Sequence, residues 1–143
     1  MKLAICTDVF ADLSYTDMLD KVKSLGIDAV EMTAGGWGAR KHCNTAELLA
    51  DEGKHEAFMM ELEKRGMRIS ALNTSCNPLW PSKTGEEYKK SMYDCATLAG
   101  LLGVKKIVAM AGLPAGNETD TTPNWITSTV SWPDFMAMST SGR

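Results

Sequence analysis

The sequence predicts an α/β protein in which short parallel strands alternate with helices. Three glycines carry this prediction, because each lies between a helical stretch and a β-branched run, in "LGIDAVEM", "RGMRISAL" and "LGVKKIVAM". They are Gly26, Gly66 and Gly103. A helix that ends at a glycine in the left-handed conformation can turn back within a few residues into a strand. Strands and helices that alternate in this way form right-handed βαβ crossovers and a parallel sheet.

Four short apolar runs are expected to form the strands, since their lengths and flanking residues are typical of strands. They are residues 2–9, 27–33, 67–73 and 104–111.

Each predicted helix begins at a polar capping residue. Ser14 is expected to cap the first helix, and Asn44 a second helical region that Gly53 divides. Thr84 and Glu87 have the spacing of a capping box and predict the start of the third helix. The three glycines named above end these helices.

Composition and charge limit the class of protein. A chain of 143 residues with 44% hydrophobic and 23% charged residues is typical of one globular domain. The formal net charge is -3 and no basic run is present, so nucleic acid is not expected as a partner. No segment approaches 18 apolar residues, and the N-terminus lacks the pattern of a secretory signal, so we expect a cytoplasmic protein that does not bind membranes.

The four cysteines show no CxxC pair and no zinc-site spacing, so reduced thiols are expected. Cys6 and Cys95 are predicted to be small core residues. Cys43 and Cys76 fall in predicted loops and remain candidates for a role in a site.

Two architectures fit four such βα units, an open doubly wound sheet and part of an eight-stranded barrel. The loops contain neither GxGxxG nor GxxxxGK[ST], so nothing favours a nucleotide-binding open sheet. In both architectures a site lies at the carboxyl ends of the strands, where "TAGGWGARKHCN", "NTSCNPLWPSKT" and "GLPAGNETDTTPNWITSTVSWP" begin.

The segments "GIDAVEM", "GGWGARKHCN", "NTSCNPLWP" and "TTPNWITSTVSWPDF" resemble the opening half of the xylose-isomerase-like TIM-barrel proteins, the sugar phosphate isomerase/epimerase group. The resemblance implies a partial (β/α)8 barrel of four βα units over residues 1–136. Residues 137–143 depart from the family pattern, which predicts a divergent or truncated tail.

The resemblance also implies an activity, the interconversion of aldose and ketose or the epimerisation of a ketose by metal-assisted proton transfer. The family uses a divalent metal (Mn, Mg, Co or Zn) held by residues of strands five to eight. A complete barrel needs about 250 residues, so this chain alone is expected to hold no metal and to be inactive.

Candidate substrate contacts begin with the first two strands. Glu31 lies on the strand face shared with Ala29 and Thr33, where its carboxylate either holds a substrate hydroxyl or forms an ordinary salt bridge. Asp8 and Phe10 follow the first strand and are expected to line the mouth of the site, with capping of the next turn as the alternative role of Asp8.

The next candidates lie in the loop after the second strand. Trp37 occupies a glycine-rich segment, where core packing alone does not explain a tryptophan. His42 is assigned a substrate contact only because its loop resembles the family's. The glycines of this loop are also candidates to offer backbone N–H groups to an anion such as a sugar phosphate.

The loop after the third strand supplies Asn73, Cys76 and Asn77. An amide donates to and accepts from hydroxyl groups without a pKa, which suits sugar recognition. The alternative is that both asparagines cap turns.

No convincing set of metal ligands is present, because the candidate side chains show neither i, i+4 nor HxE spacing. They are Asp8, Glu31, His42, Glu118 and Asp120.

Two other functions remain open. One is a non-catalytic carbohydrate-binding module, which would bind sugar without metal. The other is a half-barrel that forms a homodimer, or pairs with a different second chain, to close the sheet, because a four-strand half leaves edge strands and one inner face uncovered. An endonuclease of the same superfamily is disfavoured by the acidic pI.

Overall fold

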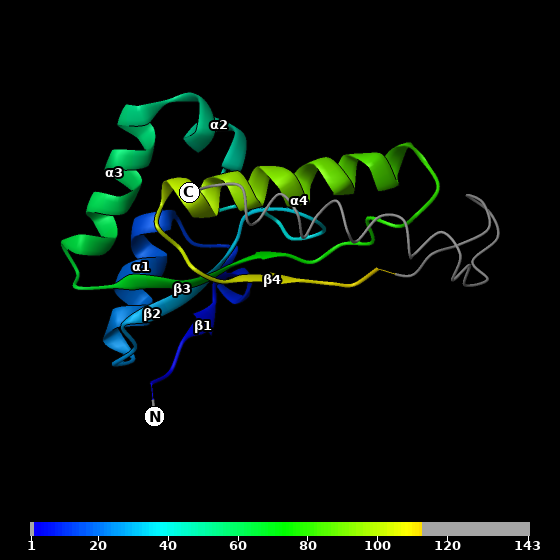
Figure 1. The fold of residues 1–143 in the computed structure, drawn as a ribbon. Helices are drawn as coiled ribbons and strands as arrows, with labels where there is room; N and C mark the ends of the chain where they lie inside the picture. Colours follow the sequence, from blue (N-terminus) through cyan, green and yellow to red (C-terminus); the bar gives the residue numbers. More distant parts are fainter. Residues whose placement is uncertain (1, 113–143) are drawn as a thin grey trace.

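A computed structural model describes residues 2–112, in which four parallel strands form one sheet in the order β1-β2-β3-β4 (Figure 1). The strands are β1 (Ile5–Cys6), β2 (Ala29–Thr33), β3 (Arg68–Thr74) and β4 (Ile107–Ala109). The helices are the 3-10 helix η1 (Thr7–Phe10) and the α-helices α1 (Tyr15–Ser24), α2 (Thr45–Ala50), α3 (Glu52–Glu63) and α4 (Lys83–Leu101). The predicted α/β class with parallel strands is confirmed.

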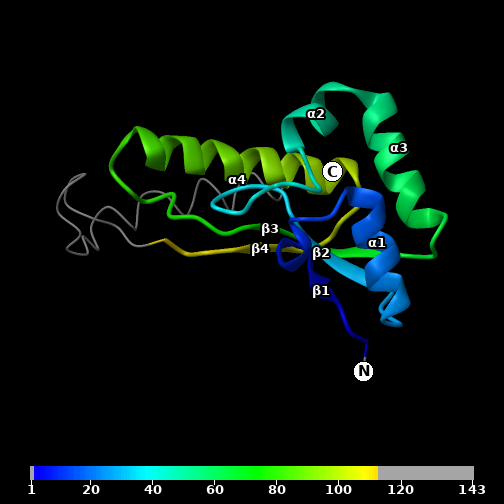
Figure 2. The same cartoon turned by 180° about the vertical axis from the view of Figure 1, so that it is seen from behind.

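One hydrophobic core joins the helices to one face of the sheet. Met18 of α1, Leu62 of α3 and Leu98 of α4 are fully buried in the same cluster as Met32 and Leu72 of the strands. Figure 1 and Figure 2 show α2, α3 and α4 together on this side, which we call the covered face. Within residues 2–112, no α-helix packs on the opposite face, which we call the open face.

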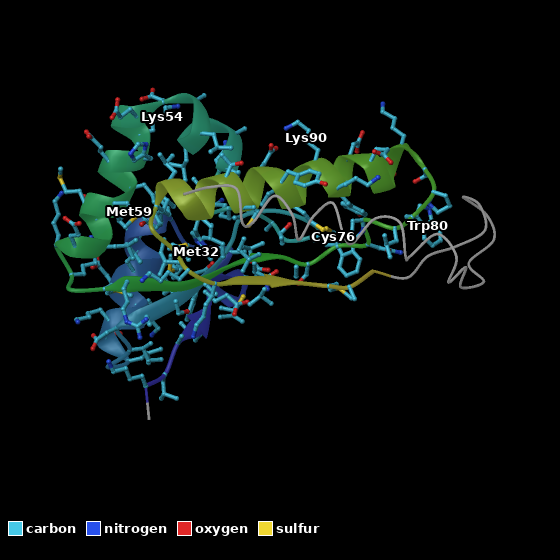
Figure 3. All side chains as sticks on the ribbon, in the orientation of Figure 1. Met32, Lys54, Met59, Cys76, Trp80 and Lys90 are labelled. Atoms are coloured by element: carbon cyan, nitrogen blue, oxygen red, sulfur yellow. The ribbon has the colours of Figure 1, made fainter. Side chains whose placement is uncertain are left out.

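The stick view shows the same layering (Figure 3). Met32 lies between the sheet and the helices, whereas Lys54 and Lys90 project from the outer surfaces of α3 and α4. None of the helices in residues 2–112 is both long enough and apolar enough to cross a membrane.

The glycine turns that predicted the fold are present. Gly26, Gly66 and Gly103 have φ angles of 74°, 59° and 67°, which is the left-handed region. Each glycine follows the last turn of α1, α3 or α4, as expected. The first and last strands are shorter than predicted, since the runs at residues 2–9 and 104–111 pair over only two and three residues, whereas β3 has the predicted length of seven residues.

The helix starts are confirmed in two cases and corrected in two. The side chains of Ser14 and Asn44 accept from the backbone N–H groups of the third residue after each cap. α4 begins earlier than predicted, because Ser82 and not Thr84 is its N-cap. The second helical region divides at Asp51, which ends α2 and caps α3, and not at Gly53.

Three of the four cysteines are fully buried free thiols, namely Cys43, Cys76 and Cys95. Cys6 is half-buried in β1. The tail at residues 137–143 and the metal candidates Glu118 and Asp120 lie outside the described residues.

Candidate functional site

The open face carries a carboxylate and an amide that contact each other at the carboxyl ends of two neighbouring strands. Asn73 Nδ2 of β3 donates to Glu31 Oε1 of β2 at 2.6 Å. The two residues lie 42 positions apart in the sequence, so the contact depends on how β2 and β3 pair. Both side chains are half-buried, so ligand atoms can approach them from the open face.

A register shift in β3 places Asn73 on this face. Val30 pairs with Ile69, but Glu31 pairs with Ala71, so Ser70 is an extra residue in β3. Strict alternation from Ile69, which packs against the core, would put Asn73 on the covered face. The extra residue reverses the alternation, and the Ser70 hydroxyl donates to the Val30 carbonyl oxygen at 2.9 Å.

A serine in the following loop fixes the orientation of the amide. The backbone N–H and the hydroxyl of Ser75 donate to Asn73 Oδ1 at 2.9 Å and 2.8 Å. With its oxygen held in this way, the amide must present its NH2 group to Glu31. Within residues 2–112 Glu31 forms no ion pair, so the salt-bridge alternative has no partner there.

Thr33 and Asp8 extend this polar group. Thr33 shares the strand face of Glu31, and its buried Oγ1 has no hydrogen-bond partner in the described part of the chain. Asp8 of η1 lies beside it, because a Cβ on Gly38 would contact both the Thr33 methyl group and Asp8 Oδ2. A buried hydroxyl without a partner is uncommon, and because this oxygen has no accessible surface, a ligand can pair with it only if the loop around Gly38 moves.

The loop after β2 is fixed against β3 and α4. The Gly36 N–H donates to Ser91 Oγ at 2.9 Å, and the Trp37 N–H donates to the Ser75 carbonyl oxygen at 3.0 Å. The Trp37 ring, 55% exposed, meets Tyr88 edge-on with ring centroids 6.3 Å apart. A rigid exposed ring next to the loop after β3 can pack on the apolar face of a ligand.

The same hydrogen bonds contradict the expectation of an anion site at two of the three loop glycines, Gly35 and Gly36, and do not test it at Gly38. The Gly35 N–H donates to the Asn73 carbonyl oxygen at 3.2 Å, and those of Gly36 and Trp37 are used as described above. These three amides therefore have protein acceptors and do not form a cradle for a phosphate.

The remaining predicted contacts lie away from this group. Phe10 packs against the core cluster, and His42 is buried with its Nε2 at 3.1 Å from the Leu13 carbonyl oxygen. Cys76 is buried between β3 and α4 (Figure 3), and its burial raises the thiol pKa. Asn77 is half-buried, and its Oδ1 accepts from the Leu79 N–H at 3.3 Å, which is a turn contact.

Of the predicted residues, the structure thus brings together Asp8, Glu31 and Asn73. Trp37 is linked to this group by Ser75, which hydrogen-bonds to both Trp37 and Asn73. Thr33, Ser75 and Ser91 were not predicted as functional residues. The carboxyl end of a strand is a signal for Thr33, but nothing in the sequence marks the two serines. Among residues 2–112, no three His, Cys, Asp or Glu side chains come close enough to hold a metal ion.

Comparison with known proteins supports the fold. No family model matches the chain. The uncharacterized protein YfiH of Bacillus subtilis (strain 168) is 50% identical over 136 residues, which cover 95% of this chain and 44% of YfiH. The crystal structure of the probable 3-DHS dehydratase AsbF, involved in petrobactin synthesis in Bacillus anthracis, superposes with a TM-score of 0.57 at 22% identity.

The AsbF comparison covers 79% of this chain and 39% of the AsbF chain. The four parallel strands of residues 2–112, with helices between them, are consistent with part of a TIM barrel, the fold of that neighbour. The chain spans less than half the length of both proteins.

Proposed function

We propose that residues 2–112 form the substrate-binding half of a xylose isomerase-like barrel that isomerises or epimerises a sugar. The observation that carries the proposal is the Glu31 carboxylate on the open face, held by Asn73 and without an ion-pair partner in residues 2–112. The resemblance of the loops to sugar phosphate isomerases and the TIM-barrel fold of AsbF support it.

Each polar group has a defined part in binding. Glu31 Oε2 accepts from a sugar hydroxyl, while Oε1 is already occupied by Asn73. The Thr33 hydroxyl pairs with a second sugar hydroxyl, because it has no partner in the described part of the chain. A hydrogen bond to a charged group contributes about 1.5 to 3 kcal/mol, which makes Glu31 the strongest expected contact.

An unphosphorylated sugar fits this site better than a sugar phosphate. The N–H groups of Gly35, Gly36 and Trp37 donate within the protein, and the nearby side chains Asp8 and Glu31 are acidic. Acidic groups without a cation repel a phosphate. The proton transfer itself is assigned to groups outside residues 2–112, and no metal ligand is assigned within them.

The test is a binding titration of the 143-residue chain with a panel of aldoses, ketoses and their phosphates, followed by calorimetry or NMR. We expect binding of a neutral sugar that Glu31→Gln weakens by about 10-fold to 100-fold. Glu47→Gln is the matched control, because Glu47 also accepts from an asparagine amide at 2.6 Å but lies at the exposed start of α2. If no sugar binds, or if both variants weaken binding equally, the proposal fails.

Thr33→Val provides a second test with the fold intact. Since the hydroxyl is buried without a partner, its removal should leave the free energy of unfolding unchanged or slightly increased. Sugar binding should nevertheless weaken by several fold. Unchanged binding would remove Thr33 from the proposed site.

A carbohydrate-binding unit without catalysis is the second candidate. It is favoured because Glu31 contacts an amide and not a second acid or base, so residues 2–112 have a binding group but no proton-transfer pair. Sugar binding that EDTA leaves unchanged, without turnover of the bound sugar, would favour this candidate over the isomerase.

A further inference from the structure

A groove between α1, α2 and α3 is a feature that the proposed function leaves unexplained. Its volume is about 380 Å³, and small-molecule sites typically have roughly 300 to 1,000 Å³. Its walls come from the start of α1, the loop before α2, and the two helices α2 and α3. Lys54, labelled on α3 in Figure 3, is one of its lining residues. The groove shares no residue with the candidate site on the open face.

His42 is a buried polar residue in the wall of this groove, with only 7% of its surface exposed. Its Nε2 lies 3.1 Å from the Leu13 carbonyl oxygen, which can only accept, so Nε2 carries the proton. In the neutral ring the other nitrogen, Nδ1, is then an acceptor. Nδ1 has no hydrogen-bond partner in the described part of the chain and is not fully enclosed. The fold therefore holds one tautomer and leaves an acceptor for a ligand.

Lys41 adds an unpaired cation beside this acceptor. It precedes His42 in the chain, lines the same groove and forms no ion pair within residues 2–112. The other charged side chains of the groove already have partners. Lys54 contacts Glu47 at 2.9 Å, and Glu61 contacts two basic residues at the end of α3, each at 2.6 Å. An anionic ligand can thus bind Lys41 without displacing a described protein group.

The remaining wall of the groove is apolar. The Tyr15 ring stacks on Phe58, with ring centroids 4.7 Å apart and 11° between the ring planes. The Tyr15 hydroxyl donates to the Phe58 carbonyl oxygen at 2.9 Å, so its proton is already used. Leu48 and Ala57 complete the apolar lining. The hydrocarbon or aromatic part of a ligand can pack on this wall.

We propose that this groove binds a small hydroxy acid with an apolar body. The carboxylate pairs with Lys41, the hydroxyl donates to His42 Nδ1, and the apolar body packs on Tyr15 and Phe58. Because Lys41 and His42 are adjacent in the chain and line one groove, the two polar groups of the ligand lie close together, as in an α-hydroxy acid. An amino acid fits less well, since its ammonium group would lie beside the Lys41 cation.

The test uses the 143-residue chain with phenyllactate as the probe, in a titration followed by NMR of the His42 ring. Two comparison ligands each lack one group: phenylpropionate has no hydroxyl, and phenylethanol has no carboxylate. We expect phenyllactate to bind and each comparison ligand to bind about 3-fold to 10-fold more weakly. If phenyllactate does not bind, if all three ligands bind equally, or if phenylalanine binds more tightly, the proposal is overturned.

His42→Gln separates binding from structure. The glutamine amide can still donate to the Leu13 carbonyl oxygen, but it places no acceptor at the position of Nδ1. This variant should weaken phenyllactate binding by about 3-fold to 10-fold and leave phenylpropionate binding unchanged. A role that is only structural would weaken the binding of both acids equally, and that result would remove His42 from the site.

Lys41→Gln tests the cation and decides the matter if His42→Gln does not fold. It should weaken the binding of phenyllactate and phenylpropionate by about 2-fold to 5-fold and leave phenylethanol binding unchanged. The matched control is Lys21→Gln, because Lys21 is also exposed and without an ion pair in residues 2–112 but does not line the groove. The control should bind all three ligands like the wild type. Equal losses in both lysine variants would show a general charge effect and overturn the proposal.

Discussion

The covered face and the open face of the same sheet are built differently. On the covered face Val30, Met32 and Leu72 are fully buried among residues of α1, α3 and α4. On the open face Glu31 and Asn73 are half-buried and held by hydrogen bonds to each other and from Ser75. The covered face therefore supplies most of the stability, and the open face remains available for a ligand or a partner.

A second comparison concerns two asparagine–glutamate pairs with the same 2.6 Å distance. Asn44 and Glu47 are three residues apart at the start of α2, whereas Asn73 and Glu31 join two strands. The first pair stabilises a helix end, and the second creates a surface to which a ligand can bind. The same chemistry thus has a local role in one place and a proposed binding role in the other.

The largest expected difference between the faces comes from removing an apolar side chain from each. Leu72→Ala should lower the free energy of unfolding by about 2 to 5 kcal/mol, because it leaves a cavity in the core. Val108→Ala on the open face should cost less than about 1 kcal/mol. Urea denaturation followed by circular dichroism measures both, and equal losses would show that the open face is also part of a core.

The next largest change in the free energy of unfolding is expected where the loops after β2 and β3 contact each other. A Cβ on Gly36, which has a φ of 71°, would meet the Ser75 carbonyl group. Gly36→Ala should therefore cost about 2 to 4 kcal/mol. Gly26→Ala, at a φ of 74° but with no atom within 4 Å, should cost only about 1 to 2 kcal/mol. Thermal unfolding of both variants tests this, and a Gly26 variant as unstable as the Gly36 variant would argue against the loop contact.

The buried thiols of the covered face predict a pH effect. Burial raises the pKa of both Cys43 and Cys95 to about 12, compared with 9.0 for an exposed thiol. A folded-state pKa above the unfolded value contributes stability that is present below pH 9 and lost as the pH rises toward 12. At pH 10 each thiol should cost about 1 kcal/mol. Melting temperatures between pH 8 and pH 10.5 measure this loss.

Two variants show which buried groups cause the loss of stability at high pH. Cys95→Ala should flatten the pH dependence, whatever its effect on stability at pH 7. Tyr15→Phe separates the contribution of the Tyr15 phenol, because burial also raises the pKa of that group. A Cys95→Ala protein with the wild-type slope would show that this thiol is not protected from ionisation.

The smallest expected effect on stability is the same for two asparagine variants, which differ instead in sugar binding. Asn44→Ala and Asn73→Ala should each lower the free energy of unfolding by about 1 kcal/mol, the first through loss of a helix cap and the second through loss of a hydrogen bond. Only Asn73→Ala should also weaken sugar binding, because it frees Glu31 to rotate. A binding titration of both proteins measures this, and equal binding by the two would contradict a ligand role for the open face.

The sequence predicted most of the helices because their signals are local. The cap at Ser14 and the glycine at position 26 flank one helix and need no partner elsewhere in the chain. The start of α4 was wrong because two hydroxyl residues compete there. A Cβ on Gly85 would overlap the Trp80 carbonyl oxygen, and the Gly85 N–H donates to Ser82 Oγ at 3.3 Å, so Ser82 and not Thr84 is the cap.

The candidate site was only partly predictable, because its main contact depends on strand register. The face of Glu31 follows from alternation within β2, but the face of Asn73 depends on the extra residue Ser70 in β3. No local pattern marks that residue as a bulge. His42 shows the reverse case, in which the sequence suggests a substrate contact that the fold does not expose on the open face. This loop histidine is buried, with its ring against the Leu13 carbonyl oxygen.

The order of the strands also has a consequence for how the chain acquires its structure. Each strand pairs with the next one along the sequence, so the partner of each new strand has already been synthesised. Nothing in residues 2–112 requires β1 to wait for the end of the chain, and pairing can follow the ribosome as the polypeptide emerges. At each stage the most recently synthesised strand forms an edge of the sheet and is available to the next strand. The order of synthesis therefore favours pairing between strands that are neighbours in the sequence.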